Sequence, residues 1–215
     1  MDQLVNKMKL TVVFSTRKIE DSYIEHIKET CGIKEIEILS YDNPNGTSLT
    51  EIYNKALIDS KNDIIVFCHD DIKFDTKNWG RKMLGIVNHS NEGKTWESQY
   101  SKAFINDIIP VVMVDGLFFG VDRTKIKKNF NEEVKGFHFY DVDFSFRNHL
   151  EEVKIGVITN IRITHKSIGE TNEEWEKNRI KFVERYSSNL PSEVPVEVFY
   201  PKKDTYIKKQ PKLSI

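Results

Sequence analysis

Apolar and polar residues along the first half of the chain form blocks that predict strands and helices in turn. Short apolar runs rich in β-branched side chains predict strands over 10–14, 36–39 and 64–68. Between them, apolar residues at helical spacing predict helices over 20–31 and 49–57. This order predicts an α/β fold of the Rossmann type, in which helices flank a mostly parallel sheet.

The second half of the chain has a less regular pattern. A polar stretch over 88–108 predicts a loop-rich insert, and Pro191, Pro195, Pro201 and Pro211 interrupt the basic C-terminal segment. We therefore expect one domain over 1–187 and a Pro/Lys-rich extension over 188–215. The pattern further predicts helices over 79–87, 140–150 and 173–186, and strands over 111–114, 117–121, 153–158 and 161–165.

Composition excludes several classes of function. Lys and Arg number 32 against 33 Asp and Glu, and this balance argues against general nucleic-acid binding. The apolar runs are too short to cross a bilayer, and the N-terminus does not read as a signal peptide. Cys31 and Cys68 form neither a disulfide framework nor a metal-ligand spacing. We expect a cytoplasmic protein.

Polar clusters follow three of the predicted strands, where ligands bind in an open parallel sheet. They are Ser15-Thr16-Arg17, Tyr41-Asp42-Asn43 and His69-Asp70-Asp71. Adjacent carboxylates beside an imidazole gain little unless a cation compensates their charge, so the last cluster predicts a site for Mn²⁺ or Mg²⁺. A helix N-cap or an Asx-turn built on one of these aspartates is the structural alternative.

A second acidic pair, Asp141 and Asp143, follows an aromatic run at the start of a predicted helix. An N-cap explains only one of the two carboxylates, and the other has the setting of a general base. The alternative is a helix start made acidic by the helix dipole. His165 ends a short predicted strand, and it has a functional role only if a metal site lies nearby.

Together these pieces resemble the GT-A glycosyltransferases, and among them the compact bacterial family 2-like enzymes. The likeness covers about residues 9–186, in the right order. Segments 52–57 and 63–71 resemble the helix and strand that lead into the Asp-x-Asp motif. Segment 114–116 resembles the acceptor-side strand, 139–147 the segment that carries the catalytic base, and 163–166 the later metal-binding histidine.

The resemblance implies a role for each matching residue. Ser15, Thr16, Arg17, Asp42 and Asn54 would line the nucleotide pocket, and Asp70, Asp115 and Gly116 would also contact substrate. Asp71, His165 and His69 would hold the metal that bridges a diphosphate. Asp141 would remove the proton from the acceptor hydroxyl, while Asp143 and Arg147 would support that segment. The family implies a nucleotide-sugar donor, UDP-linked above all, and inversion at the anomeric carbon.

Two positions depart from the family pattern. His69 stands where the first aspartate of Asp-x-Asp is usual, and Tyr140 replaces the usual glutamate. The Gln-x-x-Arg-Trp motif of processive enzymes does not follow Arg147. The expected activity is therefore the addition of a single sugar to a glycan or lipid-linked acceptor, for instance in surface glycan synthesis.

Two other functions stay open at the level of sequence. A nucleotidyltransferase would also use a metal and paired carboxylates, but the segment after the first predicted strand, Ser15-Thr16-Arg17-Lys18, lacks the glycines of a phosphate loop. A non-catalytic GT-A-like domain that binds a sugar or nucleotide is compatible with the changes at His69 and Tyr140. The Lys-rich tail over 201–215 could contact the inner face of an anionic membrane, or could be a solvated terminus.

Overall fold

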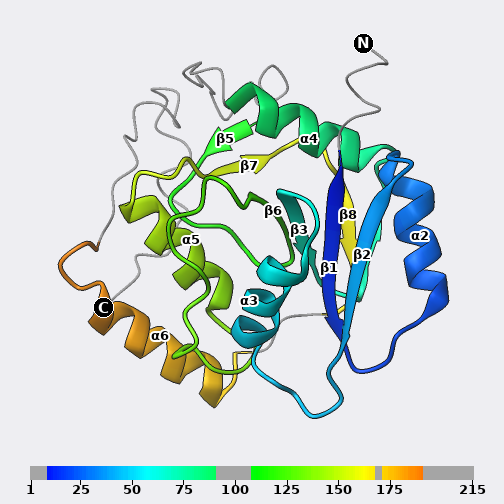
Figure 1. The fold of residues 1–215 in the computed structure, drawn as a ribbon. Coiled ribbons are helices and arrows are strands. Elements are labelled where there is room, and N and C mark those ends of the chain that lie inside the picture. Colours follow the sequence, from blue (N-terminus) through cyan, green and yellow to red (C-terminus); the bar gives the residue numbers. More distant parts are fainter. Residues whose placement is uncertain (1–8, 91–107, 168–170, 191–215) are drawn as a thin grey trace, which may run out of the picture.

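The computed structural model describes residues 9–90, 108–167 and 171–190 (Figure 1). In the first half, strands and helices alternate as the sequence predicts. The elements are β1 (Leu10–Thr16), α2 (Asp21–Cys31), β2 (Ile36–Asp42), α3 (Leu49–Asp59) and β3 (Ile64–Cys68). The second half contains β4 (Ile72–Phe74), α4 (Trp79–Ser90), β5 (Ile108–Pro110), β6 (Phe118–Asp122), α5 (Tyr140–Leu150), β7 (Gly156–Ile158), β8 (Ile163–His165) and α6 (Glu173–Arg185).

The central sheet has the strand order β2-β1-β3-β6. β1 pairs in parallel with β2 and β3, and β6 joins the edge of β3 antiparallel. The parallel strands end at the same edge, so the segments that follow β1, β2 and β3 lie close together. The predicted α/β class, with a mostly parallel sheet and flanking helices, is confirmed.

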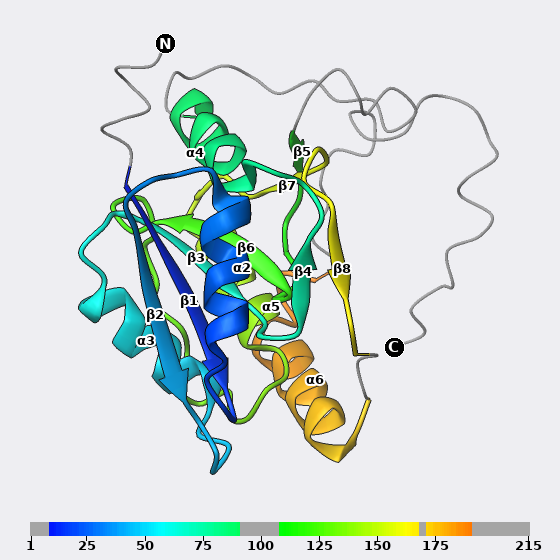
Figure 2. The same cartoon turned by 90° about the vertical axis from the view of Figure 1, so that its right-hand side faces the viewer.

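Alternating side chains of β1 and β3 divide the core into two layers. Val12 and Val66 pack with α2 and α4 on one face of the sheet. Val13 and Phe67 pack with α3 and α5 on the other face. Figure 2 shows α2 in front of the sheet in that view and α3 and α5 beyond it. Burial on both faces explains why the buried parts of these strands are mainly apolar.

The structure corrects several predictions in the second half. Residues 111–114 form no strand; the nearest strand, β5, ends at Pro110. The acceptor-side segment 114–116 is therefore a loop that leads into β6. Of the predicted insert over 88–108, residues 88–90 belong to α4, residue 108 begins β5, and 91–107 lie outside the described residues. The C-terminal extension lies outside them from residue 191 onward.

β4 is a strand that the sequence pattern does not predict, because it has only three residues. It pairs antiparallel with β8, and the register sets Ile72 opposite His165. This small sheet brings two chain segments together that are far apart in sequence. Within the described residues, no helix combines the length and the apolar character that a membrane span requires.

Candidate metal and substrate site

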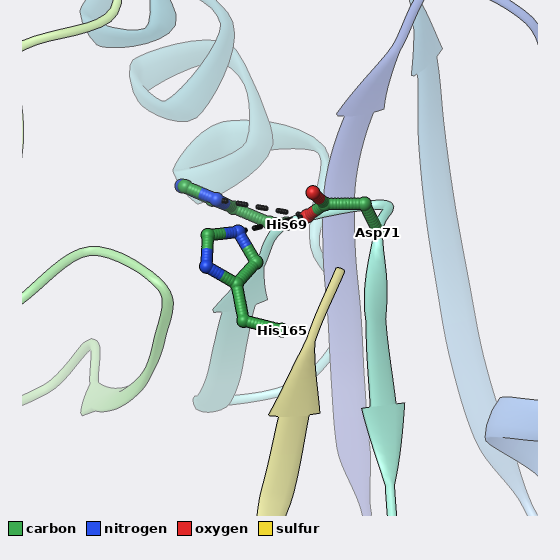
Figure 3. Close-up of side chains that lie close together, drawn as sticks. All are labelled: His69, Asp71 and His165. Carbon is green, nitrogen blue, oxygen red and sulfur yellow. Dashed lines mark ion pairs between the residues drawn. The ribbon is translucent and has the colours of Figure 1, made fainter. Parts of the chain in front are cut away.

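His69, Asp70 and Asp71 form the tight connection between β3 and β4, at the carboxyl edge of the central sheet. The connection leads into a strand, so the helix N-cap alternative for these aspartates is wrong. β8 ends at His165, beside the β3–β4 connection, and the Lys166 amide donates to the Asp71 carbonyl at 3.2 Å. The β4–β8 pairing thus places His165 next to Asp71 (Figure 3).

Three side chains converge at this point, and their donor atoms lie within 4.8 Å of one another. His165 Nε2 is 3.2 Å from Asp71 Oδ1, and His69 Nδ1 is 4.0 Å from the same oxygen. Among the described residues, this buried oxygen has no hydrogen-bond partner. Metal bonds to such donors are about 2.0–2.2 Å long, so one ion can bridge atoms at these separations.

The charge states of these side chains suit a cation. Burial acts to raise the pKa of the Asp71 carboxyl, but the Ser167 hydroxyl and the two histidines outweigh it and bring the pKa below its usual value. Burial lowers the pKa of His69, against the opposing charge of Asp71. At neutral pH the site therefore presents a carboxylate and a neutral imidazole, the forms that ligate metals.

Asp141 lies in the first turn of α5, one residue after Tyr140. Phe139 occupies the N-cap position with a left-handed backbone, so neither Asp141 nor Asp143 is the N-cap residue. The Asp141 carboxylate accepts a short hydrogen bond from the Gly116 amide. Burial raises the pKa of this carboxyl to about 6, and the nearby charge of Asp115 adds to the shift.

Tyr140 connects the metal-ligand cluster to the Asp141 segment. Its hydroxyl lies 3.2 Å from His69 Nε2 and donates to the Gly116 carbonyl at 3.0 Å. A Cβ atom built on Gly116 would lie 2.1 Å from the Tyr140 hydroxyl and 2.9 Å from Asp141 Oδ2. Gly116 therefore allows both side chains to approach its backbone closely.

The residues expected to bind the nucleotide end β1 and β2. Thr16 pairs in register with Asp42, and Asn43 donates to the Ser15 hydroxyl at 3.3 Å. Arg17 and Asp42 are exposed, whereas Thr16 is buried and its hydroxyl bonds the Lys18 backbone. Ser15, Thr16, Arg17 and Asp42 are thus neighbours at the edge of the sheet.

Three other predicted substrate residues have different surroundings. The amide of Asn54 is engaged with Phe130 and Glu132, which gives this side chain a role in holding the 130–132 segment. Asp70 is exposed in the β3–β4 turn. Asp115 is exposed as well and accepts from the Leu117 amide.

Two residues support the site in ways that the sequence did not predict: Tyr23, which it did not single out, and Asn43, which it placed in a polar cluster without a role. Tyr23 donates to the His69 carbonyl at 2.6 Å, and its position on α2 shows no sequence signal for this. Asn43 binds both the Thr47 amide and the Thr47 carbonyl and so closes the loop after β2. Its place before Pro44-Asn45-Gly46 is the signal that could have identified it, since asparagine commonly organises such turns.

Part of the chain matches a known protein family. Residues 82–186, just under half of the chain, match the model of the glycosyltransferase-like family. The matched range includes Asp115, Gly116, Asp141 and His165. The predicted resemblance to family 2-like glycosyltransferases is confirmed, and the mixed sheet with its flanking helices is consistent with a GT-A-like fold.

Among solved structures, the chain is similar to the crystal structure of A197 from STIV. The two proteins share 15% sequence identity with a TM-score of 0.49, over 75% of this chain and 87% of that one. No curated protein matches the chain.

Proposed function

We propose that the protein transfers a sugar from a nucleotide-sugar donor to a hydroxyl acceptor, with Asp141 as the general base. The observation that carries the proposal is the setting of Asp141. Its carboxyl has a pKa of about 6 and is held by the Gly116 amide, beside a cluster of candidate metal ligands. A base with a pKa near neutrality is both ionised at pH 7 and strong enough to take a proton.

Asp71, His165 and His69 are the residues that would hold a divalent cation. Two observations on the described residues support this assignment: Asp71 Oδ1 is buried without a hydrogen-bond partner, and burial favours the neutral imidazole of His69. A set of two imidazoles and one carboxylate favours a first-row ion such as Mn²⁺ over Mg²⁺, which prefers oxygen ligands alone. When bound, such an ion neutralises the negative charge that develops on a leaving diphosphate.

In the proposed reaction, an Asp141 carboxylate oxygen takes the proton of the acceptor hydroxyl. The acceptor oxygen forms a bond to the anomeric carbon of the donor, and the bond from that carbon to the diphosphate oxygen breaks. The electron pair of the broken bond leaves with the nucleoside diphosphate. Attack opposite the leaving group inverts the anomeric centre, as the family resemblance implies.

Ser15, Thr16, Arg17 and Asp42 would receive the nucleoside at the adjoining strand ends. The register of Thr16 with Asp42 supports this assignment, since it places both at one edge of the sheet. UDP is the expected nucleotide. Asp70 and Asp115 would face the diphosphate and sugar side, next to the ligand His69 and the peptide of Gly116.

A panel of UDP- and GDP-sugars with Mn²⁺ tests the proposal. We expect one donor to bind and to be hydrolysed slowly without an acceptor, with release of the nucleoside diphosphate. Asp141→Asn should bind that donor equally well and lose turnover. If the wild type binds a donor but shows no turnover, the protein is a binding module. If it releases pyrophosphate from a nucleoside triphosphate and a sugar phosphate, it is a nucleotidyltransferase.

A cytoplasmic location and a glycan or lipid-linked acceptor are part of the same proposal. The Lys-rich tail over 201–215 lies outside the described residues, and its contact with an anionic membrane remains a prediction. Co-sedimentation with anionic vesicles, with and without residues 201–215, tests it.

A further inference from the structure

The two departures from the family pattern touch each other. His69, in place of an aspartate, and Tyr140, in place of a glutamate, lie 71 positions apart in sequence. Their polar side-chain atoms, His69 Nε2 and the Tyr140 hydroxyl, are 3.2 Å apart. Two unusual residues that contact each other point to one altered interaction rather than to two independent losses.

The direction of the hydrogen bonds at Tyr140 determines which nitrogen of His69 carries a proton. Among the described residues, the Tyr140 hydroxyl is the donor to the Gly116 carbonyl, at 3.0 Å in a buried setting. A hydroxyl has a single hydrogen to donate, so towards His69 the Tyr140 oxygen acts as an acceptor. His69 must then carry its proton on Nε2.

The other ring nitrogen of His69 is left with a free lone pair. This atom, Nδ1, faces Asp71 Oδ1 at 4.0 Å, and that oxygen has no hydrogen-bond partner among the described residues. In Figure 3, dashed lines join one ring nitrogen of His69 and one of His165 to the same oxygen of Asp71. The free lone pair is therefore directed at the position that an ion bound to Asp71 and His165 would occupy.

We propose that Tyr140 is a positioning residue that fixes the tautomer of His69, so that Nδ1 is the metal-ligating nitrogen. The inference rests on the proposed function, because it concerns the metal site of that enzyme. The hydrogen bond that Tyr23 donates to the His69 carbonyl at 2.6 Å holds the backbone of the same residue.

The same hydroxyl links the metal site to the base. Tyr140 binds the carbonyl of Gly116, and Asp141 binds the amide of Gly116. The residue Gly116 is thus held on one side by the group that orients His69 and on the other by the proposed base. A substitution of Tyr140 should therefore weaken metal binding as its main effect. A smaller change in the pH dependence of turnover should accompany it.

The experiment uses the full chain and compares wild type with Tyr140→Phe and Tyr186→Phe. Tyr186→Phe is the matched control, since it also removes a buried tyrosine hydroxyl, one that donates to Asp143 at 2.9 Å. Nitrogen-15 NMR of the metal-free protein reports the tautomer of His69, assigned through His69→Gln. The EPR signal of free Mn²⁺ reports metal affinity without any need for turnover.

We expect the Nε2–H tautomer of His69 in the wild type. Tyr140→Phe should lose this preference and bind Mn²⁺ about 10-fold more weakly or worse, the usual effect of losing a group that orients a ligand. Tyr186→Phe should bind as the wild type does. An Nδ1–H tautomer of His69 in the wild type, or unchanged Mn²⁺ affinity in Tyr140→Phe, would overturn the inference.

The outcomes of these experiments distinguish a failure of the proposed function from a failure of this inference. If the wild type binds Mn²⁺ with the expected tautomer but binds no nucleotide sugar, the role of Tyr140 stands and the sugar-transfer proposal falls. If the wild type binds no Mn²⁺, the metal site is contradicted and the inference falls with it.

Discussion

Asp141 and Asp143 lie two residues apart in α5, but the two sides of the helix give them different surroundings. Asp143 is 1% exposed, and its Oδ1 accepts from Arg185 at 3.0 Å and from Tyr186 at 2.9 Å. Asp141 is bonded by backbone amides, and burial, with a smaller contribution from the negative charge of Asp115, raises its pKa to about 6. A carboxylate whose negative charge is balanced by a cation stabilises the fold. A carboxylate that is held only by backbone amides can still exchange a proton near neutral pH.

α6 accounts for the environment of Asp143 and for the shape of the loop before α5. Asn178 donates to the Lys135 and His138 carbonyls at 3.0 Å each, and Glu174 accepts from the Phe137 amide. Arg185, on the same helix, reaches Asp143. The helix thus binds the chain on both sides of Phe139, where the backbone turns left-handed before Asp141. The side of α5 that carries Asp143 therefore supports the side that carries the proposed base, Asp141.

The largest effect is expected from Asp141→Asn. Removal of a general base lowers kcat by about 10²–10⁴-fold. The stability of the Asp141→Asn variant should not fall below that of the wild type. The reason is the difference in the aspartate pKa between the two states, which is ~4 in unfolded chains. In the folded protein the same group titrates at about 6, so the wild type loses stability as pH rises between these values and the variant does not. Steady-state kinetics and thermal melting at pH 4 and pH 7 measure both effects.

Gly116→Ala should produce the next largest effect. The added Cβ would lie 2.1 Å from the Tyr140 hydroxyl and 2.9 Å from Asp141 Oδ2, so at least one of the two side chains must move. Misplacement of a catalytic group by about 1 Å costs on the order of 10²-fold in rate. Gly120→Ala is a control of the same chemistry, with a Met83 side chain as its nearest neighbour. Equal activity of the two variants would contradict a role for the Gly116 peptide.

Asp143→Asn should affect stability more than chemistry. It leaves Arg185 without its buried partner, at a cost of about 2 kcal/mol, below that of fully buried pairs because the Arg185 side chain is 30% exposed. Urea denaturation measures the change. Glu176→Gln, which breaks the exposed pair with Arg179, should leave the midpoint almost unchanged. A stable Asp143→Asn variant without turnover would mean that Asp143 takes part in the reaction.

The smallest effect concerns the pH profile. The base acts when ionised, so kcat/KM should fall about tenfold for each pH unit below the Asp141 pKa and level off above it. The inflection is expected at about pH 6. Asp115→Asn removes a negative neighbour and should move this inflection to lower pH, by a small amount because Asp115 is exposed and its charge is screened. An inflection that moves upward would contradict the assignment to Asp141.

The first half of the fold and the identity of the candidate residues follow from the sequence alone. The strands at 64–68 and 10–14 can be predicted because burial on both faces makes them almost wholly apolar, with Thr11 as the one polar residue, and α5 begins and ends where its pattern predicts. Asp71, His165 and Asp141 stand out as polar groups at element ends. The strand expected over 111–114 was wrong, since four consecutive apolar residues carry no period that separates a strand from a partly buried loop.

How these residues meet depends on tertiary contacts. The three-residue pairing of β4 with β8 brings His165 to Asp71, and such a short strand has no recognisable pattern. The contact of His69 with Tyr140 shows that the two departures from the family pattern belong to one interaction. Periodicity reports which face of an element is buried, whereas register and hydrogen-bond direction depend on a partner far away in the chain. These two properties place the candidate ligands together and set the proton on His69.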